Sequence, residues 1–198
     1  MDLERLKANL EKRGFAFRYF ETGGEVADYI CSQLHGTTVG IGGSRTVDTI
    51  GVYDRLCQDN QVYWHWKQDP DMARANALVA KTYICSANGI AETGEIINID
   101  GACNRLAACM YDKERVFIVA GVNKVEKDYD SALWRARNIA APLNARRFNV
   151  DTPCVKGDLR CYDCSSPERI CRALQVLWKK PMSVEQMEVL LINEELGY

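Results

Sequence analysis

Four of the nine cysteines gather near the end of the chain, in the pattern Cys154-x6-Cys161-x2-Cys164-x6-Cys171. Two thiolates separated by two residues can bind one metal centre, and four soft sulfur ligands suit zinc or a [4Fe–4S] cluster. The alternative is four unligated cysteines, two of which could form a disulfide. We expect the metal site, because the C-x-x-C turn and the two flanking thiols supply a complete ligand set.

Residues 40–46, here called the glycine loop, follow a strand-like run and lead into a helix start. Gly42 and Gly43 let a ligand approach the backbone closely. The free N–H groups at a helix start then attract negative charge, which Arg45 would strengthen. The loop lacks both the Gly-Lys-Ser/Thr ending of a P-loop and a full G-x-G-x-x-G, so no nucleotide cofactor is evident. A tight turn with Ser44 as helix cap explains these residues equally well, and both interpretations stay open.

Two more loops follow strand-like runs and carry polar side chains. Glu92, with Thr93 and Gly94 after it, could act as a general base or a covalent nucleophile, although a solvated loop glutamate is the simpler explanation. Asn123 and Lys124 suit a carbonyl or phosphate oxygen, or are surface residues. Ligands of open α/β sheets bind at the carboxyl ends of the strands, so we expect these loops and the glycine loop to converge on one site.

Two further polar groups have two explanations each. Asp100, Asn104 and Arg105 either line the same cleft or cap a helix. Arg137, Asn144 and Arg147 either contact an anion or form a charged helix surface. His65 lies in an aromatic run, Tyr63 to Trp66, and is expected to be packed rather than catalytic.

The elements that must position these residues alternate between strand-like and helical runs. Val116 to Gly121 is a continuous apolar run, which is typical of a strand buried on both faces of a parallel sheet. Two last strand-like runs, Leu174 to Trp178 and Val189 to Ile192, are expected to complete the same sheet. A helix is expected from about Tyr129 to Ala141, ended by Pro142.

This alternation predicts the α/β class, with an open, doubly wound, mostly parallel sheet. We expect one domain, residues 1–198, with a cysteine-rich segment at 152–172. That length suits a single well-buried domain.

Composition excludes several classes of partner. The chain has 25 basic and 27 acidic side chains, a net charge of -2, so nucleic acid is not an expected partner. No apolar run approaches the roughly 18 residues of a membrane span. The charged N-terminus resembles no signal peptide, so we expect a cytoplasmic protein without a membrane partner. Assembly into a homo-oligomer stays open.

Several motifs together resemble the lactate-utilisation (LUD-domain) family. They are the glycine loop, Ile90 to Gly94, Val119 to Lys124, the Ala141-Pro142…Asn144…Arg147 pattern, and Glu194 to Tyr198. The most specific is Ala-Glu-Thr-Gly, although Glu95 follows it where many members carry a second threonine. The resemblance implies a fold similar to ribose-5-phosphate isomerase, glucosamine-6-phosphate deaminase and CoA transferases. Those relatives bind phosphosugars or CoA esters at these strand ends.

The resemblance also implies two alternative functions. The first is binding or conversion of a small anionic metabolite (phosphorylated, acyl or hydroxy-acid), with Glu92 as acid, base or nucleophile. The second is a non-catalytic metal- or iron–sulfur-bearing subunit that docks oxidoreductase partners, because some family members belong to an iron–sulfur system that oxidises lactate. Because some family members belong to such an iron–sulfur system, the resemblance favours a [4Fe–4S] cluster first and zinc second as the group bound by the four cysteines.

Overall fold

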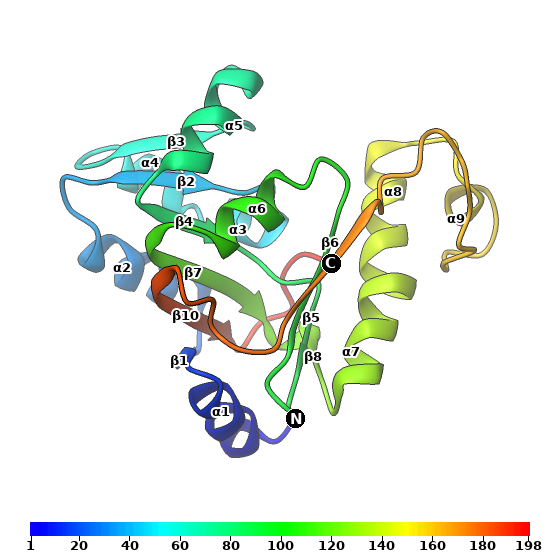
Figure 1. Cartoon of the computed structure of the whole chain (residues 1–198), viewed down its shortest axis with the longest axis horizontal. Coiled ribbons are helices and arrows are strands. Elements are labelled where there is room, and N and C mark those ends of the chain that lie inside the picture. The colour runs from blue at the N-terminus through cyan, green and yellow to red at the C-terminus, as the bar shows by residue number, and fades with distance from the viewer.

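The main sheet contains six parallel strands. Their spatial order is β1 (Ala16–Phe20), β10 (Val184–Ile192), β7 (Lys113–Gly121), β4 (Thr82–Cys85), β2 (Thr38–Ile41) and β3 (Gln61–Trp64). The computed structural model describes residues 1–198. It confirms the predicted open, doubly wound α/β sheet (Figure 1).

Strand β7 shows why the sheet is buried on both faces. Val116 and Ile118 belong to one hydrophobic cluster of 19 buried residues, whereas Phe117 and Val119 belong to a second cluster of 17. Successive side chains of a strand point to opposite faces, so an uninterrupted apolar run requires cover on both sides.

Helices provide that cover. The first cluster is covered by α1 (Leu3–Lys12), α5 (Pro70–Val79) and α6 (Asn104–Met110). The second is covered by α2 (Gly23–Gln33), α3 (Arg45–Thr49) and α4 (Val52–Leu56). Local side chains fix where these helices begin: Thr22 forms a capping box with Glu25, and Asp69 accepts a hydrogen bond from Met72 N–H.

A second sheet of four strands lies beside the first, in the order β8 (Val125–Glu126), β5 (Gly89–Ala91), β6 (Ile96–Asp100) and β9 (Ala173–Leu177). The prediction that the run at 174–178 completes the main sheet is therefore wrong, because β9 pairs antiparallel with β6. The run at 189–192 does join the main sheet, as part of β10. An apolar pattern predicts a strand but does not name its partner.

The helix expected to end at Pro142 continues instead to Phe148. Helix α7 (Tyr129–Arg135) runs into a π-helical segment (Ala136–Ala140) and then into α8 (Ala141–Phe148). Ala141 N–H donates to the carbonyl of Ala136, five residues back. The wider turn accommodates the proline ring and its missing donor at the start of α8. In Figure 1 this long helix stands against the second sheet, and the segment containing α9 (Pro153–Lys156) lies beyond it.

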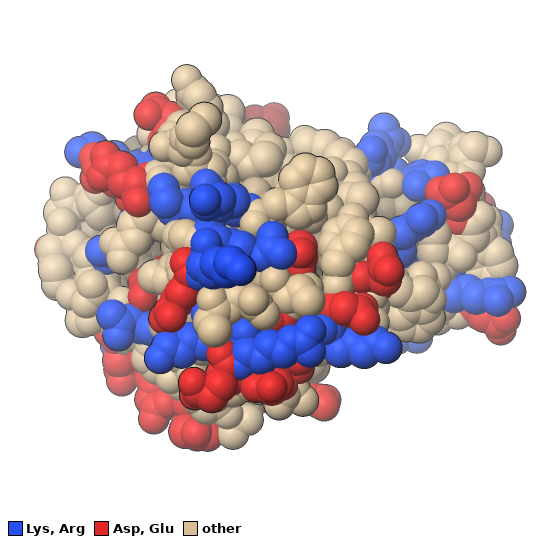
Figure 2. All heavy atoms as spheres, turned by 60° about the horizontal axis from the view of Figure 1, so that its bottom comes forward, with Lys and Arg blue, Asp and Glu red and all other residues tan.

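Figure 2 shows a face that carries both charges. Lys and Arg side chains form a band on it, and Asp and Glu side chains lie directly beside that band. None of the helices combines the length and the apolar character that crossing a bilayer requires.

Candidate functional site

A cavity of about 420 Å³ lies at the carboxyl edge of the main sheet. Four successive strands contribute the residues that follow their last positions, as expected for an open α/β sheet. The second sheet, α8 and the cysteine-rich segment close the other sides. Lining residues from the strand ends are Gly43–Thr46 after β2, His65 and Trp66 after β3, Ser86–Asn88 after β4, and Lys124 after β7.

The wall of this cavity is strongly cationic. Seven of its side chains are Lys or Arg and only two are Asp or Glu, in a chain whose net charge is -2. The basic residues are Arg45, Arg74, Arg105, Lys124, Arg147, Arg169 and Arg172, six of them arginines, and the carboxylates are Asp100 and Glu168. Such a focused positive field attracts small anions.

The structure brings part of the predicted site together. Gly43, Ser44, Arg45 and Lys124 line the cavity. Ser44 also caps α3 by accepting a hydrogen bond from Val47 N–H at 3.2 Å, so both interpretations of the glycine loop have a structural counterpart. Helix α3 has only five residues, so side chains rather than a helix dipole supply most of the positive charge.

Gly42 lies just outside the cavity wall. Its N–H donates to Ile84 O at 2.9 Å, and a Cβ at this position would lie 3.0 Å from the Tyr83 hydroxyl and 3.4 Å from Arg105. Gly42 therefore allows close packing behind the wall rather than direct approach of a ligand.

The structure places Glu92 away from the cavity. Its carboxylate accepts a hydrogen bond from Asp2 N–H at 2.7 Å and lies 3.5 Å from Arg5 Nη1, so it ties the start of α1 to the second sheet. The physical reason is strand β5, which intervenes between β4 and Glu92 and carries the chain off the main sheet. Thr93 and Gly94 follow Glu92 there and also do not line the cavity.

Asn123 lies beside Lys124 in sequence but is not part of the lining either. Its side-chain oxygen accepts a hydrogen bond from Leu196 N–H at 3.2 Å. This contact holds the end of the chain against the loop after β7.

Ser86 is a cavity residue that sequence reasoning missed. Thr46 and Asn88 also line the cavity; they lie in the glycine loop and at the start of the segment 88–94, but were not predicted as binding residues. Ser86 and Asn88 come directly after the buried strand β4. The available signal was therefore their position as the first polar side chains after an apolar strand, rather than the more conspicuous Glu92 beyond them. Of the ambiguous groups, Asp100, Asn104, Arg105, Asn144 and Arg147 line the cavity, and so does His65, whose pKa is lowered mainly by burial.

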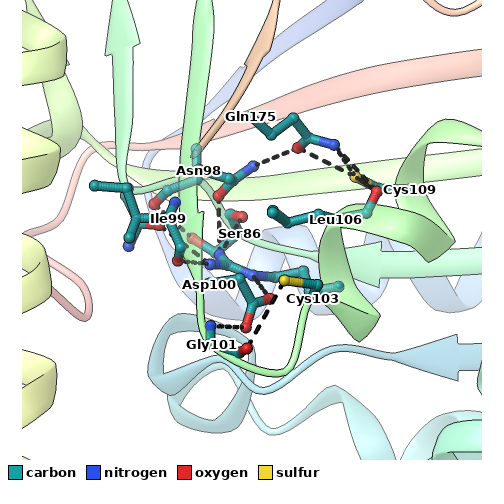
Figure 3. Close-up of polar contacts among 12 residues, drawn as sticks. Ser86, Asn98, Ile99, Asp100, Gly101, Cys103, Leu106, Cys109 and Gln175 are labelled. Carbon is teal, nitrogen blue, oxygen red and sulfur yellow. Dashed lines mark hydrogen bonds and ion pairs between the residues drawn. The ribbon is translucent and has the colours of Figure 1, made fainter. Parts of the chain in front are cut away.

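Arg105 holds the loops around the cavity in place. Its side chain is buried and each of its five N–H groups can donate to an oxygen atom. Figure 3 labels four of the residues that supply the acceptors, Ser86, Asn98, Ile99 and Asp100. The acceptors are Ser86 O at 3.2 Å, Asn98 Oδ1 at 2.9 Å, Asn88 Oδ1 at 3.1 Å, Ile99 O at 2.8 Å and Asp100 Oδ2 at 3.4 Å. Because its donors are occupied, Arg105 positions the site rather than offering a free donor to a ligand.

Lys124 occupies the floor of the cavity with only 3% of its surface exposed. Its Nζ donates hydrogen bonds to Thr46 Oγ1 and Ser86 Oγ, both at 2.8 Å. Burial, and to a smaller extent the neighbouring guanidinium groups of Arg135 and Arg105, lower the pKa of Lys124 to about 7. A large share of the amine is therefore uncharged at neutral pH.

The four tail cysteines border one small pocket of about 20 Å³. No three of them lie close enough together to form a ligand set for an ion, so the segment as folded here does not fit a metal or a cluster. Arg169 organises the segment by donating to Cys164 O at 2.6 Å and Cys171 O at 2.9 Å. Cys171 lines the large cavity as well as the small pocket.

A parallel, doubly wound sheet with a ligand cavity at its carboxyl edge defines the general class of this protein. The chain belongs to the LUD-domain family, because the model of the LUD domain matches residues 3–192. Among curated proteins, none matches the chain.

Two solved structures resemble the fold. A DUF162 family protein from Deinococcus radiodurans is 12% identical, with a TM-score of 0.58 and 96% of each chain covered. The beta subunit of eIF2B from Chaetomium thermophilum is 17% identical, with a TM-score of 0.37 over 55% of this chain and 44% of that one. At these identities the first similarity concerns the fold alone, and the second is too weak to support an argument.

Proposed function

We propose that this LUD-domain protein binds and acts on a small anionic metabolite, of the phosphorylated, acyl or hydroxy-acid class, in the cavity at the carboxyl edge of the main sheet. The single observation that carries the proposal is the excess of seven Lys and Arg side chains over two carboxylates in its wall. The volume of about 420 Å³ falls within the usual range for small-molecule sites, roughly 300–1,000 Å³.

Three of the cations have donors that the fold does not fully use. Arg147 donates from Nε to Asn144 and stacks over the Trp66 ring at 5.2 Å. The Nε of Arg74 is buried with no hydrogen-bond partner. Burial lowers the pKa of Arg147, Tyr198 opposes that shift, and the like charge of Arg45 lowers the pKa by a smaller amount. Arg45 donates to Asp48 at 3.1 Å from one of its nitrogens. A bound anion would relieve this repulsion and supply the missing acceptors, which supports an anion as the ligand.

Thermal unfolding in the presence of inorganic phosphate, sulfate and lactate tests the proposal. A ligand at one hundred times its Kd stabilises a fold by about 2.7 kcal/mol, which is readily measured as a rise in Tm. We expect phosphate or lactate to raise the Tm of wild type and of the control Arg146→Gln, which changes an arginine on the same helix that does not line the cavity. Arg147→Gln should lose most of the rise, and an equal rise in both variants would remove this cavity from the proposal.

Gly43→Val provides a second test, in the glycine loop. An added Cβ would lie 3.3 Å from His65 Nε2 and 3.3 Å from Trp66 Nε1, so a valine would crowd this part of the cavity wall without altering charge. We expect a reduced response to phosphate with little loss of secondary structure.

The second candidate function is a metal- or iron–sulfur-bearing subunit of a lactate-oxidation-type redox complex. It is favoured by one observation: all four tail thiols border the same pocket, and Cys171 also reaches the cavity. Ligation of one centre by all four would require the segment to tighten around it, since no three thiols lie together in the fold described here. A reducing compartment such as the cytoplasm is consistent with nine unpaired cysteines.

Metal analysis of protein purified without oxygen tests this candidate. Iron with sulfide would support a cluster, and zinc would support a structural site. Cys161→Ser and Cys164→Ser should each abolish stoichiometric metal, whereas Cys85→Ser, in the hydrophobic core, should retain it. Full retention of metal in the two tail variants would refute this function.

A further inference from the structure

The buried amine of Lys124 is held in an unusual way for a lysine. It lies in the short helix Val122–Lys124 at the end of β7, where the chain turns over the carboxyl edge of the sheet. Its hydrogen-bond partners are two hydroxyl oxygens, and it forms no ion pair with a carboxylate. A buried ammonium without a counter-ion is costly, so this environment favours the neutral amine.

The hydroxyl protons indicate how the amine is held. Thr46 donates its hydroxyl proton to Leu196 O at 3.1 Å, so at 2.8 Å its oxygen must accept from Lys124 Nζ. Ser86 Oγ has two other neighbours, Thr46 Oγ1 and Ala87 O, each at 3.5 Å, which is long for a bond between oxygens. Its hydroxyl proton is therefore free to be donated to Nζ at 2.8 Å once the amine is neutral.

The charged groups that face the amine also favour its neutral form. Arg135 comes from α7 and Arg105 from α6, and both carry positive charge. The Cys85 thiol on β4 is the one group whose charge would favour the ammonium, but its hydrogen bond with Cys109, and then burial, raise the pKa of Cys85 well above its usual range. The thiol therefore remains neutral and does not offset the two guanidinium groups.

We propose that Lys124 Nζ is a nucleophile that forms an imine with the carbonyl carbon of an anionic aldehyde or ketone held by the cavity cations. This inference rests on the proposed anion site and names its substrate class: a carbonyl compound that carries a carboxylate or a phosphate. The amine lies on the cavity floor, and the arginines that would hold the anionic group line the walls. A neutral amine in a desolvated pocket is the usual form of an imine-forming lysine.

The reaction balances without an oxidant or a reductant. The lone pair of Nζ attacks the carbonyl carbon, and the carbonyl oxygen takes up a proton from the Ser86 hydroxyl as the C–N bond forms. One nitrogen proton then restores the Ser86 hydroxyl. Ser86 next passes a proton to the carbinol oxygen, which leaves as water as the C=N bond forms, and the second nitrogen proton returns to Ser86. The sum is amine plus carbonyl giving imine plus water, with Ser86 as proton carrier and Thr46 as a positioning residue.

Borohydride trapping tests the inference with defined probes. Wild-type protein is incubated at pH 7 with glyoxylate, with glycolaldehyde phosphate or with neutral glycolaldehyde, then reduced and mapped by peptide mass spectrometry. We expect reductive alkylation at Lys124 with one or both anionic probes, suppressed by inorganic phosphate and much weaker with the neutral aldehyde. Preference for glyoxylate would indicate a carboxylate substrate, and preference for glycolaldehyde phosphate a phosphorylated one.

Lys113 provides an internal control. It is also buried and its pKa is also lowered by burial, but it lies at the opposite end of β7, where its Nζ donates to Leu78 O at 2.7 Å and Asp112 O at 3.0 Å. Burial alone would label Lys113 and Lys124 alike, which would contradict the inference. Ser86→Ala should slow trapping at Lys124 by on the order of 10²-fold, the scale of a lost proton-transfer group.

The parallel phosphate-dependent unfolding experiment separates the two possible failures. If phosphate raises the Tm but no probe modifies Lys124, the imine inference is wrong and the anion site stands. If phosphate has no effect and all three probes label Lys124 equally, the anion site is wrong, and with it the assignment of an anionic carbonyl substrate.

Discussion

Replacing Lys124 by Met should change how the stability of the protein depends on pH. In the folded protein the pKa of Lys124 is lowered to about 7, whereas its ordinary value is 10.5. Between these two values the unfolded chain binds one more proton than the folded chain, so the free energy of unfolding rises with pH. The penalty of burying this lysine is complete below about pH 7 and absent above about pH 10.5.

The size of the effect follows from the difference between the two pKa values. A shift of about three and a half units corresponds to a penalty on the order of 5 kcal/mol, which is relieved at about 1.4 kcal/mol per pH unit as the pH rises between the two pKa values. Lys124→Met removes the titrating group and keeps a long side chain. We therefore expect the variant to gain stability relative to wild type by a few kcal/mol at pH 6 to 7, and to lose that advantage progressively toward pH 10.

Guanidinium chloride unfolding of both proteins at several pH values, with reductant present, measures this difference. Subtracting the two curves cancels the titration of all other groups to first order. The same change at the exposed Lys127, whose ammonium lies 3.8 Å from Asp128, provides the matched lysine-to-methionine control. If the Lys124→Met difference is flat from pH 6 to 9.5, the amine is charged in the fold and the reasoning is refuted.

Three further substitutions test how the site is held in place. Arg105→Met should cost about 3 kcal/mol or more in denaturant unfolding, because it strips buried oxygen acceptors of their donors. Gly40→Ala should cost about 1–3 kcal/mol, since the new Cβ would lie 2.6 Å from the carbonyl oxygen of Ala77. Gly24→Ala, whose Cβ would make only an ordinary contact of 3.8 Å with Thr22 Oγ1, should be neutral or stabilising. Glu92→Gln should lower the Tm modestly by weakening the contact with the N-terminal segment, yet leave the response to phosphate intact; loss of that response would place Glu92 in the site.

The main sheet was largely predictable because its signals are local. A run such as Val116 to Gly121 can be satisfied only by burial on both faces, and the alternation of such runs with helical patterns defines the α/β class. The partner of β9 was not predictable, because antiparallel pairing with β6 depends on residues more than 70 positions away. The passage through Pro142 was missed because a π-helical turn has no simple sequence pattern.

The candidate site was predictable only in the parts that strand ends determine directly. The glycine loop and Lys124 follow strands of the main sheet, and both line the cavity. Glu92 carries the more distinctive motif, but a three-residue strand in the second sheet diverts it. The contributions of α8 and of the cysteine-rich segment arise from tertiary packing, which the residues near them in sequence do not encode.

The π-helical segment at 136–140 makes the cavity wall sensitive to the insertion or deletion of a single residue. The segment acts as one extra residue within a long helix, so it sets how far α8 is rotated about the helix axis relative to α7. A single-codon deletion there would rotate α8 by about 100°, the angle per residue of an α-helix. Ala132 would stay seated on the second sheet, while Asn144 and Arg147 would turn away from the cavity. During evolution, insertion or loss of this one residue would therefore exchange a whole wall of the cavity without disturbing the sheet beneath it.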